Sequence, residues 1–308
     1  MSDHLAVIVR NVTKRYGRVV ALDDLSLEVR RGEVFGLLGR NGAGKTTLIE
    51  ILEGLRVADS GEVSVLGFDP GRDLDSVKQR IGIQLQSSSF FRKLRVHEVL
   101  EQFRSYYERQ ADIDKLLALA SLNEKRNNFV ADLSIGQRQR LALALALVND
   151  PEIVFLDEPT ASLDAQVRRQ LWYTIQQMKE SGKTILLTTH YIEEAERLCD
   201  RVCIIDAGRL VALDSPASLI ASRPRCSARV RFTTLRPLSL DLLDGLCPVA
   251  ESVNGNATYV LEAENTGPTV ATLVLAIERQ NNELVELQIN KATLEDVFLE
   301  LTGKEIRQ

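Results

Sequence analysis

Four short apolar runs bounded by turn residues predict buried strands. They lie at Val34–Leu38, Ile153–Leu156, Thr184–Thr189 and Val202–Ile205. Continuous apolar runs of this length are typical of strands that are covered on both faces, as in parallel sheets. The segments between the runs show the apolar spacing of helices. Strands that alternate with helices in this way predict an α/β fold.

Two earlier stretches and one later helix complete the predicted first domain. Ala6–Val12 and Leu25–Val29 alternate apolar and polar residues, which favours an antiparallel edge sheet. Ser134 and Gln137 have the spacing of a capping box at the start of a helix. Apolar residues follow them at steps of three and four, and we expect Asp150-Pro151 to end this helix.

The character of the chain changes over residues 222–236, which contain five arginines and no acidic residue. We place a domain boundary there, with one domain at 5–221 and a second at 222–308. Arg229 and Arg231 alternate with apolar neighbours, and Asn254-Gly255 is typical of a hairpin turn. A helix after Pro268, a strand and a last helix follow, so the pattern predicts a small α+β domain. The last helix has a predicted cap, an apolar stripe and a stop at Thr293, Leu294, Val297, Phe298, Leu301 and Gly303.

Composition narrows the functional classes. The chain has 308 residues, of which 44% are hydrophobic, and its 38 basic and 43 acidic residues give a net charge of -5. This balance gives no electrostatic case for wrapping nucleic acid, so we expect no nucleic-acid partner. The longest apolar run without a polar residue, Leu141–Val148, is far shorter than the roughly 20 residues of a membrane helix. The four cysteines lack the spacing of a zinc site or a redox pair, which favours reduced thiols.

A glycine-rich loop directly follows the first buried strand. Residues 39–46 read G-x-x-x-x-G-K-T, and a helical pattern begins after them. Backbone N–H groups of such a loop and the helix N-terminus form a cradle for di- and triphosphates. Lys45 would reach the β- and γ-phosphates, and the Thr46 hydroxyl would be a hard ligand for Mg²⁺. The phosphate-binding residues that we expect are Gly39, Asn41, Gly42, Ala43, Gly44, Lys45, Thr46 and Thr47.

Two adjacent carboxylates stand at the end of the second apolar run. Asp157 and Glu158 follow Ile153–Leu156, and ligands of α/β proteins bind at the carboxyl ends of strands. Asp157 suits the Mg²⁺ side of the predicted nucleotide. Because successive strand residues point in opposite directions, we expect Glu158 to act separately, as general base on a water that attacks the γ-phosphate.

Together these motifs resemble the ATPase subunits of ABC transporters over residues 5 to about 220. Leu133–Gln137 is similar to the signature motif of that family, and Ser162-Leu163-Asp164 is similar to its D-loop. His190 falls at the switch histidine, Gln86 at the Q-loop and Tyr16 at the aromatic residue that stacks on adenine.

The resemblance implies specific partners and roles. It implies a P-loop ATPase fold with a mostly parallel sheet and a helical subdomain at about 88–148, which binds ATP and Mg²⁺. It makes Glu158, His190 and Gln86 catalytic, and Thr46, Gln86 and Asp157 the Mg²⁺ ligands. Ser134, Gly136 and Gln137 would bind the ATP held by a second copy of the chain, and Asp164 would also take part. An integral membrane permease would be the other partner, at the cytoplasmic face of the membrane.

The end of the chain indicates which branch of the ABC ATPases the sequence resembles. Residues 293–303 resemble the closing segment of ATPases that serve drug- and antibiotic-efflux exporters, so export through separate membrane subunits is the leading function. Two alternatives stay open: a non-transport ABC ATPase, and a nucleotide switch without meaningful turnover. The second is kept open by Ile135, which stands where the family usually has glycine. Phe90 and Phe91 suit either a core or the docking site of the membrane subunit, and strand register does not choose between Gln84 and Gln86.

Overall fold

The computed structural model divides the described chain between Pro216 and Ala217 into two compact units. The predicted domain limits, 5–221 and 222–308, remain a prediction. The structure describes residues 4–85, 93–161, 163–222, 228–239, 246, 249–253, 256–263 and 265–303.

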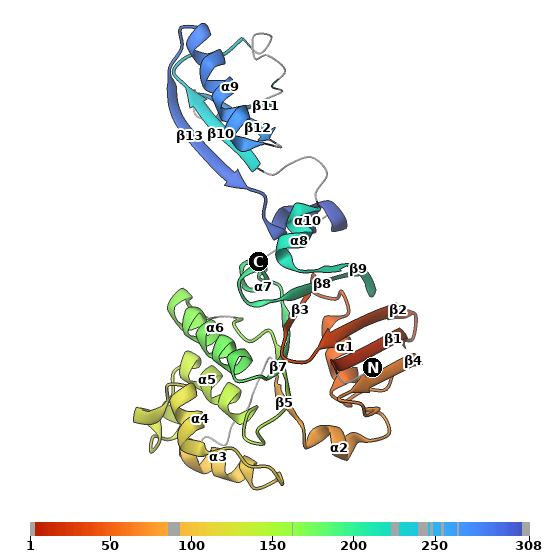
Figure 1. Ribbon diagram of the computed structural model, residues 1–308. Helices are drawn as coiled ribbons and strands as arrows, with labels where there is room; N and C mark the ends of the chain where they lie inside the picture. Colours follow the sequence, from red (N-terminus) through yellow and green to blue (C-terminus); the bar gives the residue numbers. More distant parts are fainter. Residues whose placement is uncertain are drawn as a thin grey trace. The chain divides into compact units, whose positions relative to one another are not determined.

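The first unit is built on a six-stranded sheet that confirms the expected α/β class (Figure 1). Its first five strands are parallel and the last pairs antiparallel. In spatial order the strands are β5 (Ile81–Gln84), β6 (Ile153–Asp157), β7 (Thr184–Thr189), β3 (Val34–Leu38), β8 (Arg201–Asp206) and β9 (Arg209–Asp214). Strands β3, β6 and β7 are buried along their whole length, as their continuous apolar runs predict.

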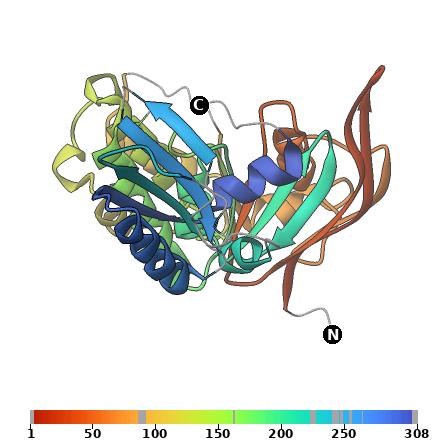
Figure 2. The ribbon, with the colours of Figure 1, turned by 90° about the horizontal axis from the view of Figure 1, so that it is seen from above.

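A second, antiparallel sheet of three strands confirms the predicted edge sheet. It has the order β2 (Val19–Arg30), β1 (Leu5–Tyr16) and β4 (Ser60–Val65). Strands β1 and β2 extend well past the predicted stretches and end in a hairpin at Tyr16 and Val19; this long pair runs down the right side of Figure 2. The hairpin therefore carries Tyr16 away from the core, where the residue remains 40% exposed.

Helix α1 (Lys45–Leu52) lies between the two sheets and joins them in one hydrophobic core (Figure 1). Its apolar residues Leu48, Ile49 and Leu52 pack with Phe35 of the parallel sheet and Leu25 of the antiparallel sheet. The remaining helices of this unit are α2 (Leu74–Lys78), α3 (Val96–Arg104), α4 (Ile113–Leu119), the short 3₁₀ turns η1 (Asn123–Lys125) and η2 (Val130–Asp132), α5 (Ile135–Leu145), α6 (Ala165–Glu180) and α7 (Ile192–Leu198). The helices from α3 to α5 lie between β5 and β6 in the sequence.

Helix α5 ends five residues earlier than the sequence pattern predicts. It stops at Leu145, and tighter hydrogen bonds to the residue three positions back carry the chain to Asp150. The reason is contact with β5. The Ala146 carbonyl approaches Gly82 so closely that a Cβ there would lie 1.8 Å from its oxygen. The Asn149 side chain donates a hydrogen bond to the Ile81 carbonyl at 2.8 Å.

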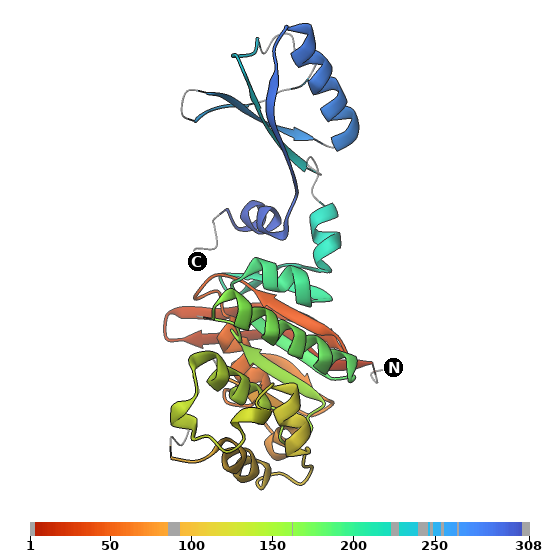
Figure 3. The ribbon, with the colours of Figure 1, turned by 90° about the vertical axis from the view of Figure 1, so that its left-hand side faces the viewer.

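The second unit is a small α+β structure, in which one helix lies on a four-stranded antiparallel sheet (Figure 3). The sheet order is β11 (Val249–Val253), β12 (Asn256–Ala263), β10 (Ala228–Thr234) and β13 (Leu284–Lys291). Helix α9 (Thr266–Arg279) buries Leu273 and Ile277 against Val230 and Phe232. Arg229 and Arg231 are exposed between these apolar residues, as the alternation predicts.

Two short helices, α8 (Pro216–Ala221) and α10 (Leu294–Thr302), complete the described chain. Thr293 caps α10, and Gly303 ends it in the left-handed conformation, as predicted. One prediction is wrong: Leu301 is exposed, so the buried stripe of α10 is limited to Leu294, Val297 and Phe298. Asn254-Gly255 lies outside the described residues, although the strands on either side of it are paired.

Cysteine chemistry and membrane spanning are both tested within the described chain. Cys199 and Cys203 are free and buried, and the other two cysteines lie outside the described residues.

Over the described ranges, we find no helix with the length and apolar character that crossing a bilayer requires.

Glu53 is a carboxylic acid buried inside the core of the first unit. It follows α1, is 1% exposed, and neither of its carboxyl oxygens has a hydrogen-bond partner among the described residues. The pKa of Glu53 is raised to about 8, mainly by burial and in smaller part by the charges of Asp157 and Glu50. The folded protein therefore holds a proton that the unfolded chain releases above about pH 4.5.

We predict that the free energy of unfolding falls as pH rises from about 5 to about 8, and that Glu53→Gln removes much of this fall. The variant keeps the shape of the neutral acid but does not ionise. Its free energy of unfolding should therefore exceed that of wild type by an amount that grows over this range, up to roughly 4 kcal/mol. Urea unfolding at both pH values measures the effect, with the exposed Glu62→Gln as matched control. Equal pH slopes for wild type and Glu53→Gln would show that Glu53 is already ionised in the folded state.

Candidate functional site

The glycine-rich loop connects the carboxyl end of β3 to the first turn of α1. Gly42 and Gly44 have φ angles of 82° and 108°, a left-handed region that favours glycine. A Cβ at Gly39 would lie 2.5 Å from the Ile205 carbonyl oxygen, so this position requires close backbone approach. The local sequence thus allows a tight loop whose backbone leads directly into the N-terminus of a helix.

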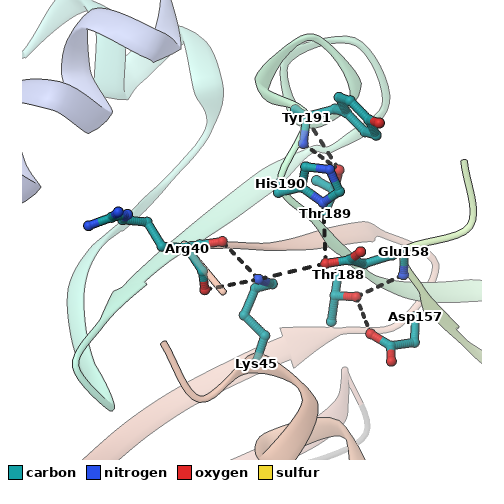
Figure 4. Close-up of polar contacts among 9 residues, drawn as sticks. Arg40, Lys45, Asp157, Glu158, Thr188, Thr189, His190 and Tyr191 are labelled. Atoms are coloured by element: carbon teal, nitrogen blue, oxygen red, sulfur yellow. Dashed lines mark hydrogen bonds and ion pairs between the residues drawn. The ribbon is translucent and has the colours of Figure 1, made fainter. Parts of the chain in front are cut away.

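Lys45, the first residue of α1, is 5% exposed and points back under the loop. Its Nζ donates hydrogen bonds to the carbonyl oxygens of Gly39 at 2.8 Å and Arg40 at 3.2 Å (Figure 4). Nζ also lies 4.0 Å from Glu158 Oε1. The loop and the acidic end of β6 are therefore joined through one ammonium group.

Asp157 and Glu158 occupy different backbone environments at the end of β6. Strand β6 ends at Asp157, and Glu158 has a φ of 47°. The side chains therefore diverge because Glu158 leaves the strand in a left-handed conformation, and the expected strand alternation is the wrong reason. Thr188 of β7 holds both residues: its Oγ1 donates to Asp157 Oδ1 at 2.5 Å and accepts from the Glu158 N–H at 2.9 Å (Figure 4).

His190 lies beside Glu158, just beyond the end of β7. Its Nδ1 is 3.2 Å from Glu158 Oε1, although the geometry is not that of a hydrogen bond. The contact is therefore an ion pair when the imidazole is protonated. The ring of Tyr191 packs against His190 with centroids 4.2 Å apart, and Thr189 Oγ1 accepts a hydrogen bond from the Tyr191 N–H at 2.9 Å.

Burial shifts the ionisation of two groups in opposite directions. It lowers the pKa of Lys45, and the neighbouring charges of Glu158 and Asp157 partly restore it. It raises the pKa of Asp157, an effect that the Thr188 hydrogen bond opposes and the Glu158 charge strengthens. Both shifts express the cost of removing charge from water, which a bound ligand of opposite charge would reduce.

An open cleft of about 450 Å³ lies over the loop. Tyr16 and Val19 of the hairpin and Lys45 and Glu158 are among its lining residues. The cleft contains eight of the predicted site residues, which are Tyr16, Asn41, Gly42, Gly44, Lys45, Thr46, Thr47 and Glu158. Gly39, Ala43, Asp157 and His190 lie in the surrounding structure and do not line it.

The predicted signature residues lie elsewhere, at the N-terminus of α5. Ser134 Oγ accepts from the Gln137 N–H at 3.2 Å, and Gln137 Oε1 accepts from the Ser134 N–H at 2.9 Å, which confirms the capping box. Gly136 is buried, and a Cβ there would lie 2.7 Å from the Val167 side chain, so this position requires glycine for close packing. Ile135 is 64% exposed and does not have a positive φ, so isoleucine causes no backbone strain here. These residues do not line the cleft in the described part of one chain.

The other predicted residues have mixed outcomes. Asp164 caps α6, where its Oδ1 accepts the N–H groups of Gln166 at 3.0 Å and Val167 at 2.9 Å. Gln86, Phe90, Phe91 and Ser162 lie outside the described residues. Gln84 is the last residue of β5, and its buried side-chain amide has no hydrogen-bond partner in the described ranges.

Sequence reasoning missed Thr188 as a site residue. It organises both carboxylates, yet it is neither charged nor part of the predicted phosphate loop. The signal that could have identified it is the polar pair Thr188-Thr189, which interrupts an apolar strand directly before His190. The backbone carbonyl of Arg40 was also missed, because sequence does not reveal which carbonyls face a lysine.

Comparisons with known proteins agree with this geometry. Residues 22–161 match the family described as ABC transporter. The chain is similar to two proteins named Nod factor export ATP-binding protein I. The one from Ralstonia nicotianae is 39% identical, with 97% of this chain and 94% of that protein covered. The one from Cupriavidus metallidurans is 40% identical, with 97% and 98% covered.

Solved structures give the same result for the fold. One described as the ATP-binding subunit of an ABC transporter has a TM-score of 0.64 at 26% identity, covering 70% of this chain and 92% of that one. A dimeric ATP-binding cassette in a post-hydrolysis state, bound to ADP and Pi, has a TM-score of 0.61 at 28% identity, covering 68% and 98%.

Proposed function

The chain belongs to the ABC transporter family, and from that premise we propose that it is the ATP-hydrolysing subunit that powers export of a substrate through separate membrane subunits. One observation carries the proposal: Lys45, Asp157, Glu158 and His190 converge at a cleft that Tyr16 also lines. A lysine beneath a glycine-rich loop, a carboxylate that can hold Mg²⁺ and a group that can position the attacking water are recurring parts of sites for phosphoryl transfer to water.

ATP would lie along the cleft, with its phosphates on the loop and its base at Tyr16. The N–H groups of residues 39–47 would bind phosphate oxygens, and Lys45 Nζ would exchange the carbonyls of Gly39 and Arg40 for the β- and γ-phosphates. The ring of Tyr16 is exposed at the hairpin end and lines the cleft, which suits stacking on adenine.

Thr46 and Asp157 are the described residues that would hold Mg²⁺. Both supply hard oxygen ligands, Thr46 is exposed in the cleft, and Asp157 stands at the adjacent strand end. Gln86 is the third proposed ligand. The bound ion would neutralise charge on the β- and γ-phosphates.

Glu158 is the proposed general base. It would accept a proton from a water molecule while that water attacks the γ-phosphorus and ADP leaves. His190 lies close enough to orient Glu158 and, through its other ring nitrogen, would sense the γ-phosphate. Gln86 would complete the catalytic set.

A second copy of the chain would complete each site. Ser134, Gly136 and Gln137 would contact the γ-phosphate of ATP bound to the partner, since the capped N-terminus of α5 presents N–H groups and a hydroxyl. Asp164, which caps α6, would also lie at this interface. The dimeric state of a solved relative supports this arrangement.

A membrane permease is the proposed second partner, on the cytoplasmic face of the membrane. A groove of about 550 Å³ between β5 and the helices α3 and α5 offers an apolar and aromatic docking surface. Leu85 and Tyr106 are exposed there, at 49% and 64%. The names of the two relatives support export as the direction of transport.

We predict that Lys45→Ala abolishes ATP binding, whereas Glu158→Gln binds ATP and loses turnover. Lys45 would contact phosphate in the ground state, but Glu158 would act only on the attacking water. Loss of a general base typically lowers the rate by about 10² to 10⁴. Calorimetry measures ATP binding, and the release of phosphate measures turnover.

The same assay separates the motor from the nucleotide switch. Wild-type turnover well above that of Glu158→Gln supports the motor. Turnover of the variant within about twofold of wild type would remove Glu158 as the base.

We also predict that Glu158→Gln forms a dimer with ATP and Mg²⁺ and is monomeric without them. A ligand shared between two chains stabilises only the dimer. Light scattering measures the mass, and adding Ser134→Arg to the same chain is the control that should prevent dimer formation. A mass that does not respond to ATP would contradict the shared site.

A further inference from the structure

Tyr16 is fixed by more than the hairpin that carries it. It is the last residue of β1, opposite Val19 of β2, and is 40% exposed. An exposed aromatic ring at a hairpin end has few apolar neighbours to hold its orientation. Stacking on a base requires a defined orientation, so the contacts that restrain this ring matter for binding.

Two cations approach the Tyr16 ring. The Arg56 guanidinium lies 5.3 Å from the ring centroid and Lys14 Nζ lies 5.7 Å from it. Both distances are within the range of cation–π attraction.

Each cation is held by its own carboxylate. Arg56 forms an ion pair with Glu50, and its backbone N–H donates to the Glu50 carbonyl at 3.0 Å. Lys14 Nζ donates to Asp59 Oδ1 at 2.8 Å. The positions of both charges are therefore set by neighbouring structure, so they are pre-organised around the ring.

The cations lie outside the nucleotide cleft, although their target ring lines it. Neither Arg56 nor Lys14 is among the cleft residues, whereas Arg56 lines a separate groove beside β4 together with Arg72. Both cations thus contact the Tyr16 ring from residues that do not line the cleft.

Helix α1 connects this arrangement to the phosphate end of the site. Lys45 is its first residue, Glu50 lies within it, and Arg56 follows it by four positions. An eight-residue helix is rigid and about 12 Å long. The group that binds phosphate and the group that restrains the base-stacking ring are consequently fixed to one element.

We propose that Arg56, held by Glu50, is a positioning residue for nucleotide binding, which restrains Tyr16 so that its free face stacks on the base. Lys14 assists from the position that Asp59 sets. The inference rests on the proposed function, because it assumes that the cleft binds a nucleotide with its base at Tyr16.

The test compares ADP with inorganic pyrophosphate, which lacks a base. We expect Arg56→Met to bind ADP about two- to fivefold more weakly than wild type, the size of an exposed cation–π contact, and to bind pyrophosphate equally well. Arg56→Lys should recover part of the loss because it keeps the charge. Arg72→Met, which removes an exposed arginine from the same groove, is the matched control and should bind ADP as wild type does.

A double-mutant cycle with Tyr16→Ala identifies the mechanism. In that background Arg56→Met should cause no further loss of ADP affinity. An undiminished loss, or an equal loss for pyrophosphate, would mean that Arg56 acts through long-range charge and would overturn the inference. If Tyr16→Ala alone leaves ADP affinity unchanged, the base site of the proposed function is wrong. If Tyr16→Ala weakens ADP binding and Arg56→Met does not, only the inference fails.

Discussion

The candidate site depends on the burial of one ammonium group among backbone carbonyls and carboxylates. Lys45 is nearly inaccessible to water, and burial of its charge lowers its pKa. Two carbonyl oxygens of the glycine-rich loop and the charge of Glu158 offset part of that cost. This constraint explains why α1 must begin at the loop and why strands β3 and β6 must end at the same edge of the sheet.

Most of the fold could be predicted from the sequence because the buried parallel strands are continuous apolar runs. Strands β3 and β7 match their predicted limits, and the capping box before α5 and the Thr293 cap of α10 form as expected. Features that depend on tertiary contact could not be predicted. Helix α5 ends early because it meets β5 at Gly82, and the hairpin that carries Tyr16 is longer than its apolar pattern indicates.

The site could be predicted where chemistry follows a strict local spacing, as in residues 39–46. The finer geometry of the site could not be predicted from the sequence. Glu158 diverges from Asp157 through a left-handed backbone angle, and Thr188 comes from a strand that carries no acidic or basic side chain. The restraint of Tyr16 by Arg56 also joins residues 40 positions apart, with no sequence motif to link them.

In the proposed mechanism residues of two chains hydrolyse each ATP, since the capped N-terminus of α5 does not line the described cleft of its own chain. Mixing two inactive variants tests this requirement most directly. Lys45→Ala and Ser134→Arg chains should each be inactive alone, but a mixed dimer retains one site with an intact loop and an intact partner helix. If each site is shared between two chains, mixing should restore ATP turnover. A mixture that forms dimers yet stays as inactive as either variant would contradict it.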